Sequence, residues 1–274
     1  MLIQIIKSII FGVVEGVTEW LPISSTGHMI LLEELMPLGV SEEFYELFSV
    51  VIQLGAILAV AVSYRKRLTP VGKRREEKRR TYKLWGLIIL GVLPSGVTGF
   101  FLDDLLDKYL YNYITVAVTL IVYGVAFIAI DRYKRKNGDT YESAENFTPR
   151  AAFFTGLFQT LALVPGTSRS GATILGAYLL GATREAATEF SFLLALPTML
   201  GAGLLKTAKF FIEGNLFSHT EIGILAIGVV TAFFTSLAVI GALTGFVRKH
   251  GFSGFGIYRI ILGAAVLIYY FLTR

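Results

Sequence analysis

Two stretches with the same layout interrupt an otherwise apolar chain. They read Gly12-Val-Val-Glu-Gly-Val-Thr-Glu-Trp-Leu-Pro-Ile-Ser-Ser-Thr-Gly27 and Gly156-Leu-Phe-Gln-Thr-Leu-Ala-Leu-Val-Pro-Gly-Thr-Ser-Arg-Ser-Gly171. Each is an apolar helical run that is broken by a proline and followed by hydroxyl side chains and a glycine. Both span the same number of residues, and Glu15 of the first matches Gln159 of the second. We interpret them as two copies of one motif.

Polar residues that break a helix are costly inside a membrane unless they line a cavity, so two such breaks in matching positions indicate a site. The composition supports a membrane setting, because 54% of the 274 residues are hydrophobic and only 16% are charged. These proportions are typical of helical proteins that cross a bilayer several times. The chain has no cysteine, which excludes disulfides and thiolate metal sites.

Six apolar spans have lengths near the roughly 20 residues that a membrane-crossing helix needs. They are residues 44–64, 84–102, 113–131, 186–206, 222–247 and 258–273. The segments 1–36 and 151–180 are also apolar, but each is broken near its middle by a proline, Pro22 or Pro165. Because lipid does not tolerate such polar breaks, we expect these two segments to form re-entrant helix–loop–helix hairpins.

The order of these segments divides a single membrane domain, residues 1–274, into two repeats, 1–140 and 150–274. Each repeat has one hairpin followed by three crossings. Because three is odd, the second repeat should lie upside down relative to the first, which is the inverted-topology architecture of many transporters. The fold class we predict is therefore an all-α polytopic membrane protein. Its two polar hairpin tips should meet near the middle of the bilayer.

Basic residues concentrate in a few loops. Residues 65–83 hold ten of the 25 lysines and arginines, and 132–150 with Arg248-Lys249 hold seven more. The positive-inside rule places these loops in the cytoplasm and the first hairpin tip toward the outside. We interpret the charge as a topology signal and predict no nucleic-acid partner, because basic clusters beside membranes usually set topology or contact anionic lipid.

Glu15 and Glu19 are four residues apart, so a helix would project both carboxylates from one face. Two like charges repel each other in a low-dielectric setting, and a divalent cation, a shared proton or a cationic partner would offset that repulsion. Acids inside a membrane usually have a function. If the partner is a divalent cation, the hard oxygen atoms of Glu15 and Glu19 favour magnesium or calcium.

Ser24, Ser25, Thr26, Gly27 and His28 follow the first break, where the second helix of the hairpin should begin. The free backbone N–H groups at the start of a helix form an anion-binding site. For Ser24, an N-cap role has equal weight with ligand contact. The imidazole of His28 is harder to explain as packing, and it is a candidate nucleophile, general base or general acid.

The second copy places Arg169 between Ser168 and Ser170 at the matching helix start. The guanidinium fork binds phosphate through two hydrogen bonds and stays charged when desolvated. Together with the acids, the histidine and the hydroxyls, Arg169 completes a set of groups suited to cleaving a phosphate ester or anhydride. A pocket inside the membrane favours a substrate with a lipid tail.

Glu15-Gly-Val-Thr-Glu-Trp-Leu-Pro-Ile-Ser-Ser-Thr-Gly-His28 and Pro165-Gly-Thr-Ser-Arg-Ser-Gly-Ala-Thr173 closely resemble the two signature regions of the bacterial undecaprenyl-pyrophosphate phosphatases, the bacitracin-resistance protein family. The likeness covers the whole chain. It implies a metal-dependent hydrolase that converts undecaprenyl pyrophosphate to undecaprenyl phosphate at the outer face of the bacterial plasma membrane. That reaction would recycle the lipid carrier for peptidoglycan and other envelope polymers. Bacitracin resistance would follow, because the antibiotic sequesters the pyrophosphate lipid.

The resemblance also implies roles for matching positions. Glu15 and Glu19 would serve the metal and the pyrophosphate, and Ser25 or His28 would attack, with the choice between these two left open. Arg169 would bind the phosphate. The complete prediction is His28, Ser25, Glu19 and Arg169 as catalytic residues, Ser24, Thr26, Gly27, Ser168, Ser170 and Thr173 as substrate-binding residues, and Glu15 and Glu19 as metal ligands.

A transporter or lipid flippase is the main alternative, because inverted repeats with broken helices are typical of transporters. In that case the two glutamates would bind the ions that drive transport, and Arg169 would bind an anionic substrate. A transporter does not need an imidazole beside a cluster of hydroxyls, which favours the enzyme. The predicted partners are the membrane and a polyprenyl pyrophosphate lipid. A homodimer is left open, since the small residues of Gly12-x-x-x-Gly16 could pack helices within one chain or between two.

Overall fold

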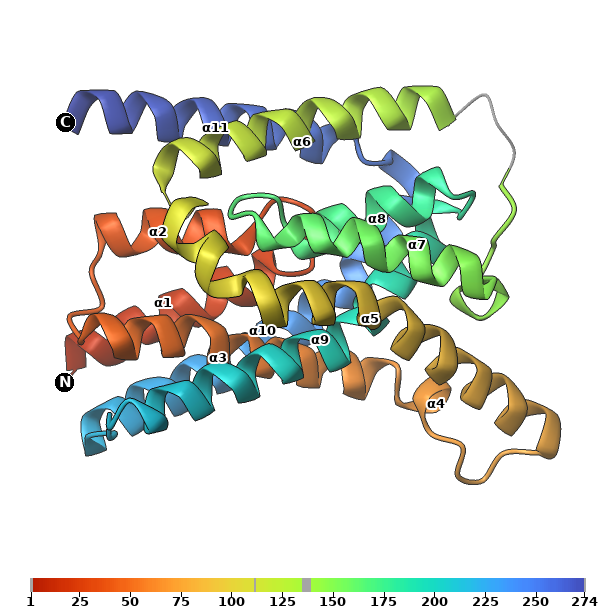
Figure 1. Ribbon diagram of the computed structural model, residues 1–274, viewed down its shortest axis with the longest axis horizontal. Helices are drawn as coiled ribbons and strands as arrows, with labels where there is room; N and C mark the ends of the chain where they lie inside the picture. Colours follow the sequence, from red (N-terminus) through yellow and green to blue (C-terminus); the bar gives the residue numbers. More distant parts are fainter. Residues whose placement is uncertain (1, 111, 135–138, 274) are drawn as a thin grey trace.

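A computed structural model describes residues 2–110, 112–134 and 139–273 of the chain (Figure 1). In chain order the helices are α1 (Leu2–Thr18), α2 (Ser25–Leu35), α3 (Glu42–Ser63), α4 (Arg65–Leu68), α5 (Arg75–Leu110), α6 (Tyr113–Lys134), α7 (Pro149–Thr160), α8 (Arg169–Leu179), α9 (Arg184–Ile212), α10 (His219–His250) and α11 (Ser253–Thr273), with short 3-10 turns at Ala144–Asn146 and Leu161–Leu163. No strand forms among these residues. The predicted all-α fold class is confirmed.

Six of these helices, α3, α5, α6, α9, α10 and α11, are long and apolar enough to cross a membrane. They match the six predicted crossings in number and order, so the chain is a multi-pass membrane protein. Each of these helices extends beyond at least one of its predicted ends, however. For example, α5 begins at Arg75, inside the predicted loop 65–83, and ends at Leu110. Hydropathy marks only the apolar part of a helix, whereas charged residues such as Glu76 and Glu77 continue the helix into water.

The two predicted hairpins correspond to the helix pairs α1–α2 and α7–α8, and the break in each contains the noted proline, Pro22 or Pro165. The second helix of each has 11 residues and begins in the same way: the Ser24 side chain accepts a hydrogen bond from the Gly27 N–H, and Ser168 accepts one from the Gly171 N–H. This shared local structure agrees with the predicted repeat. The inverted orientation of the repeats and the re-entrant path of the hairpins stay predictions.

Each hairpin packs on a long helix from the other half of the chain. α1 lies against α10, and α7 lies against α5. α3 contacts α9, while α6 and α11 run side by side along one edge of the molecule (Figure 1). The hairpin of each predicted repeat packs on a helix of the other repeat, so the halves 1–140 and 150–274 are interleaved. This arrangement brings the two hairpin tips together.

Glycines allow the closest helix contacts. A Cβ added to Gly12 would lie 2.7 Å from the carbonyl oxygen of Gly228, and one added to Gly16 would lie 2.7 Å from Thr235 Cβ. The small-residue face at Gly12 and Gly16 therefore packs on α10 within one chain. It gives no support to the homodimer, which stays a prediction.

Gly156→Ala tests the contact between the second hairpin and α5. An added Cβ would overlap the backbone of Gly91, so α7 and α5 would have to separate. Overpacking of this kind costs about 1–3 kcal/mol, and we expect the melting temperature in detergent to fall by about 5 °C. Gly241→Ala on α10 is the matched control, because nothing lies within 4 Å of its added Cβ. Equal melting temperatures for the two variants would contradict this packing.

Candidate active site

Glu19 joins the two hairpin tips. The Ser25 hydroxyl donates to Glu19 Oε2 at 2.6 Å, and Arg169 Nη2 donates to Glu19 Oε1 at 2.8 Å. The side chains of Glu19 and Arg169 are only 6% and 12% exposed, so water screens their ion pair weakly. Charge-assisted hydrogen bonds are the strong ones in such a setting. Three of the four predicted catalytic residues are therefore directly linked.

Arg169 is held from two further directions. Its Nη1 donates to the carbonyl oxygen of Ser191 on α9 at 2.9 Å. Its Cζ lies 5.8 Å from the ring centroid of Trp20, which is fully buried and packs edge-on against Phe192. A cation over an indole face is attracted by the ring's negative charge distribution. Trp20 and Ser191 fix the guanidinium, and neither was among the predicted site residues.

The buried hydroxyls of α8 tie segments together. Ser170 Oγ donates to the carbonyl oxygens of Glu19 at 3.0 Å and Leu21 at 3.3 Å, which links the second tip to the first. Thr173 Oγ1 lies 2.6 Å from Ser191 Oγ, which links α8 to α9. Both hydroxyls join the elements around the hairpin tips, and their contact with a substrate stays a prediction.

Ser24 and Ser168 cap the helices α2 and α8 with a strained backbone. Their φ angles are +74° and +72°, in a region that residues other than glycine seldom adopt. Strain of this kind persists only where the surrounding structure imposes it, and it is common at functional sites. Thr26 and Gly27 lie in the first turn of α2, where Gly27 N–H donates to Ser24 Oγ at 3.3 Å. The positive ends of both helices therefore lie at the joined tips.

Glu15 lies one turn before Glu19, as predicted: the Glu19 N–H donates to the Glu15 carbonyl oxygen at 3.0 Å. The Glu15 side chain is fully buried, and neither carboxylate oxygen has a hydrogen-bond partner in the described part of the chain. An isolated buried carboxylate is costly unless a proton or a cation satisfies it. The two oxygens without a donor would be satisfied by a proton shared with Glu19 or by the predicted cation.

No group of three or more histidine, cysteine or acidic residues that could hold a metal occurs within the residues described. Glu15 and Glu19 would thus be two protein ligands, and of these only Glu15 has oxygens without a partner within the described ranges, since the Glu19 oxygens contact Ser25 and Arg169. Magnesium commonly binds one or two carboxylates and completes its shell with water and substrate phosphates. Two carboxylates are therefore sufficient for a cation that binds together with a phosphorylated substrate.

His28 stands apart from the other predicted catalytic residues. Its Nδ1 lies 2.7 Å from the Ser24 carbonyl oxygen, and its Nε2 lies 2.7 Å from Tyr258 Oη on α11. Within the described residues it has no hydrogen bond to Ser25, which instead donates to Glu19. Sequence reasoning did not identify Tyr258, since no motif includes it.

Arg259 is the most informative residue that sequence reasoning missed. It is fully buried, and it donates to the carbonyl oxygens of Pro22 at 3.1 Å, Gly166 at 2.8 Å and Thr167 at 3.0 Å. It therefore ties the loop of one hairpin to the loop of the other. A signal existed, because Arg259 is a charged residue inside the apolar span 258–273, and such residues usually mark a function.

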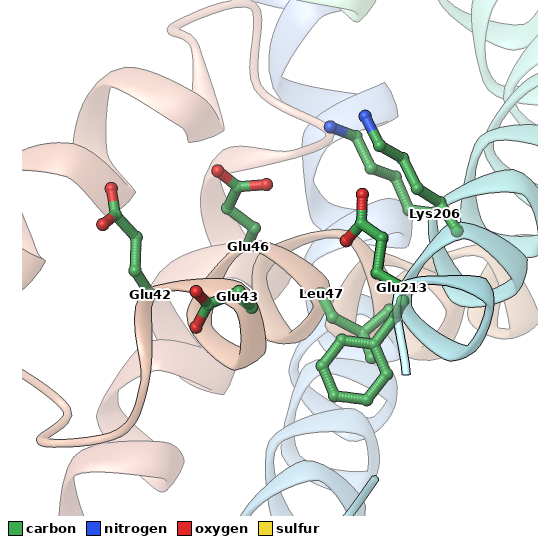
Figure 2. A pocket seen from close by; sticks show the side chains of 8 residues that line it. Glu42, Glu43, Glu46, Leu47, Lys206 and Glu213 are labelled. Atoms are coloured by element: carbon green, nitrogen blue, oxygen red, sulfur yellow. The ribbon is translucent and has the colours of Figure 1, made fainter. Parts of the chain in front are cut away.

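A separate pocket of about 240 Å³ lies between α3 and α9 (Figure 2). Its walls carry both charges, with Glu42, Glu43, Glu46 and Glu213 near Lys206 and Lys209, and Leu47 and Phe210 lie beside them. None of the predicted site residues lines this pocket. The candidate active site is instead the compact polar junction of the hairpin tips.

Comparison with known proteins gives a consistent result. The family model described as Bacitracin resistance protein BacA matches residues 8–265. A protein of Enterococcus faecalis named undecaprenyl-diphosphatase is 50% identical over 96% of each chain. Proteins of the same name from Acetivibrio thermocellus and Lactiplantibacillus plantarum are 49% and 45% identical over the full length of both chains.

Proposed function

The chain belongs to the bacitracin resistance protein BacA family, and we propose that it hydrolyses undecaprenyl diphosphate to undecaprenyl phosphate and inorganic phosphate. The observation that carries this proposal is the linked set Ser25, Glu19 and Arg169 at the joined hairpin tips. It combines a hydroxyl, a carboxylate that accepts its proton and a guanidinium suited to phosphate. These are the parts that phosphoryl transfer requires.

Ser25 is the better placed nucleophile. Its hydroxyl already donates to Glu19, whereas both ring nitrogens of His28 have other partners. Ser25 Oγ attacks the terminal phosphorus, and its proton passes to Glu19 Oε2. The bond from that phosphorus to the bridging oxygen breaks, and undecaprenyl phosphate leaves with the bridging oxygen. Arg169 and the N-terminal ends of α2 and α8 stabilise the charge that develops on the phosphoryl oxygens.

Water completes the reaction. Its oxygen attacks the phosphorus on Ser25, Ser25 Oγ recovers the proton from Glu19, and inorganic phosphate forms. One proton of the water must go to a base, and we assign this role to His28. The hydroxyls of Ser24, Thr26, Ser168, Ser170 and Thr173, with the backbone at Gly27, would bind and orient the pyrophosphate.

Glu15 and Glu19 would hold a magnesium or calcium ion. When bound, such a cation would neutralise part of the pyrophosphate charge. The support for this ligand pair is the buried Glu15 carboxylate, which lacks a hydrogen-bond donor among the described residues.

We place the protein in the bacterial plasma membrane with the site toward the cell exterior, because the basic loops favour the cytoplasm. The product would return to the synthesis of peptidoglycan and other envelope polymers. Bacitracin resistance follows from consumption of the lipid that the antibiotic sequesters. A transporter or flippase with the same pocket is the alternative, and the undecaprenyl-diphosphatase relatives do not favour it.

The first test is phosphate release in detergent, where no transport across a membrane takes place. We expect purified wild-type chain to release inorganic phosphate from undecaprenyl diphosphate when magnesium or calcium is present. A chelator should stop the release, and added cation should restore it. Glu15→Gln should raise the cation concentration needed for half-maximal rate by about tenfold, because a neutral amide is a weaker ligand.

Absence of release from a well-folded wild-type chain would refute the hydrolase and leave the flippase to be tested in liposomes. Release that persists after complete removal of divalent cations would keep the hydrolase and refute the metal site.

A further inference from the structure

We propose that Tyr258 is a positioning residue of the active site, which holds the imidazole of His28 in place through a hydrogen bond to Nε2, the proton-accepting atom. The proposal rests on the hydrolase function and concerns a residue outside both sequence motifs. Tyr258 Oη lies 2.7 Å from His28 Nε2, and the two rings are parallel, with 1° between their planes and 5.7 Å between their centroids. A separation of 2.7 Å between oxygen and nitrogen is that of a hydrogen bond.

The partner of Nδ1 determines which nitrogen accepts the proton. His28 Nδ1 lies 2.7 Å from the Ser24 carbonyl oxygen, which can only accept a hydrogen bond. Nδ1 therefore carries the hydrogen. In the neutral imidazole the lone pair is then on Nε2, where the Tyr258 hydroxyl donates.

This arrangement separates the two steps of the reaction in space. The Ser25 hydroxyl faces Glu19 Oε2, so the attack on the substrate does not need the imidazole. His28 is left for the water step. The Tyr258 hydroxyl holds the ring in place until the water takes over as donor to Nε2. The water oxygen then bonds to phosphorus as the bond from phosphorus to Ser25 Oγ breaks, and the proton of the water goes to Nε2. Ser25 Oγ takes back the proton from Glu19.

The position of Tyr258 is fixed by its neighbour in the chain. Arg259 is fully buried and bonds carbonyl oxygens in both hairpin loops, so this part of α11 cannot slide relative to the hairpin tips. Tyr258 itself is 43% exposed. Removing its hydroxyl therefore leaves no buried void, and Tyr258→Phe should keep the fold.

Tyr258→Phe tests the proposal by chemical labelling. Without the hydroxyl, Nε2 loses its donor and becomes accessible, and the imidazole is held only through Nδ1. We expect diethylpyrocarbonate, which acylates unprotonated imidazole nitrogen, to modify His28 at least threefold faster in this variant than in the wild type. Peptide mass spectrometry measures the rate at His28, and His219 and His250 in the same chain serve as internal references.

The matching kinetic result is a fall in kcat of about tenfold with KM within twofold of wild type, because the base loses its place while the substrate contacts remain. Tyr269→Phe is the control. It removes another hydroxyl from α11, one that donates to Glu34 of α2 at 3.1 Å. Labelling of His28 and kcat should match the wild type in this control.

Unchanged labelling of His28 in Tyr258→Phe, or unchanged kcat in an active enzyme, would overturn the proposal. Faster labelling confined to Tyr258→Phe, together with the fall in kcat, would support it. If labelling of His28 differed between Tyr258→Phe and wild type but the wild-type chain released no phosphate, the hydrolase function would be refuted, and with it the catalytic role of the contact.

Discussion

Glu19→Gln is expected to lower phosphate release by about 10³-fold, the largest loss for any single conservative substitution in this chain. The carboxylate performs two tasks at once, because it accepts the Ser25 proton through Oε2 and pairs with Arg169 through Oε1. An amide of the same shape does not take up the proton and carries no charge for the guanidinium. The initial rate of phosphate release in detergent, measured at saturating divalent cation, gives the ratio.

Glu213→Gln is the control for this substitution. Glu213 lines the separate pocket between α3 and α9, and the same change there should leave the rate within twofold of wild type. Both variants need melting temperatures close to that of the wild type, so that the comparison reports chemistry. If Glu19→Gln kept more than a tenth of the wild-type rate, Glu19 would not be the base for Ser25.

The sequence was sufficient to predict the helical spans and the two helix breaks. Two proline breaks followed by hydroxyls located both hairpin tips, and the matching starts of α2 and α8 followed from Ser24 and Ser168. These features depend on local rules, namely hydrophobic length, proline geometry and capping. Local rules also explain the main error: the charged start of α5 is helical, although it lacks the hydropathy that identifies a membrane span.

The contacts inside the site were harder to predict from the sequence. A carboxylate beside an arginine is a reasonable expectation, but the partners of Glu19 depend on a loop in which Ser24 adopts a positive φ, and sequence patterns do not specify that conformation. The contact between His28 and Tyr258 joins residues 230 positions apart. Such a pairing follows from where α6, the helix on which α11 packs, places Tyr258, so only the folded structure identifies it.

The two buried arginines of the site have different kinds of partner. Arg169 faces the carboxylate of Glu19, so its charge is balanced within the chain. Arg259 bonds only carbonyl oxygens in the hydrogen bonds described, from Leu120, Pro22, Gly166 and Thr167. Its charge is spread over carbonyl dipoles, and it raises the positive potential beneath the tips. This arrangement suits a pocket that receives a pyrophosphate, because the anion completes the charge balance.

Arg259→Lys should therefore reduce both stability and turnover, although it keeps the charge. A lysine presents one nitrogen in place of a planar fork, so it does not reach carbonyl oxygens in both hairpin loops at once. Breaking a buried charged network costs about 3–5 kcal/mol, which predicts a clear fall in the melting temperature. Displacing the tips by about 1 Å costs about 10²-fold in rate, and we expect that loss in the folded fraction of the variant.

Arg184→Lys separates the two effects. Arg184 Nη2 bonds Asp131 Oδ1 at 2.6 Å, and Ser253 Oγ donates to the other oxygen of Asp131 at 2.8 Å, in a cluster that contains no predicted site residue. A lysine there keeps one charged contact, so a smaller fall in melting temperature and a rate per folded molecule within twofold of wild type are expected. Should Arg259→Lys also turn over at the wild-type rate per folded molecule, Arg259 would be a structural tie alone, and the position of the tips would not depend on it.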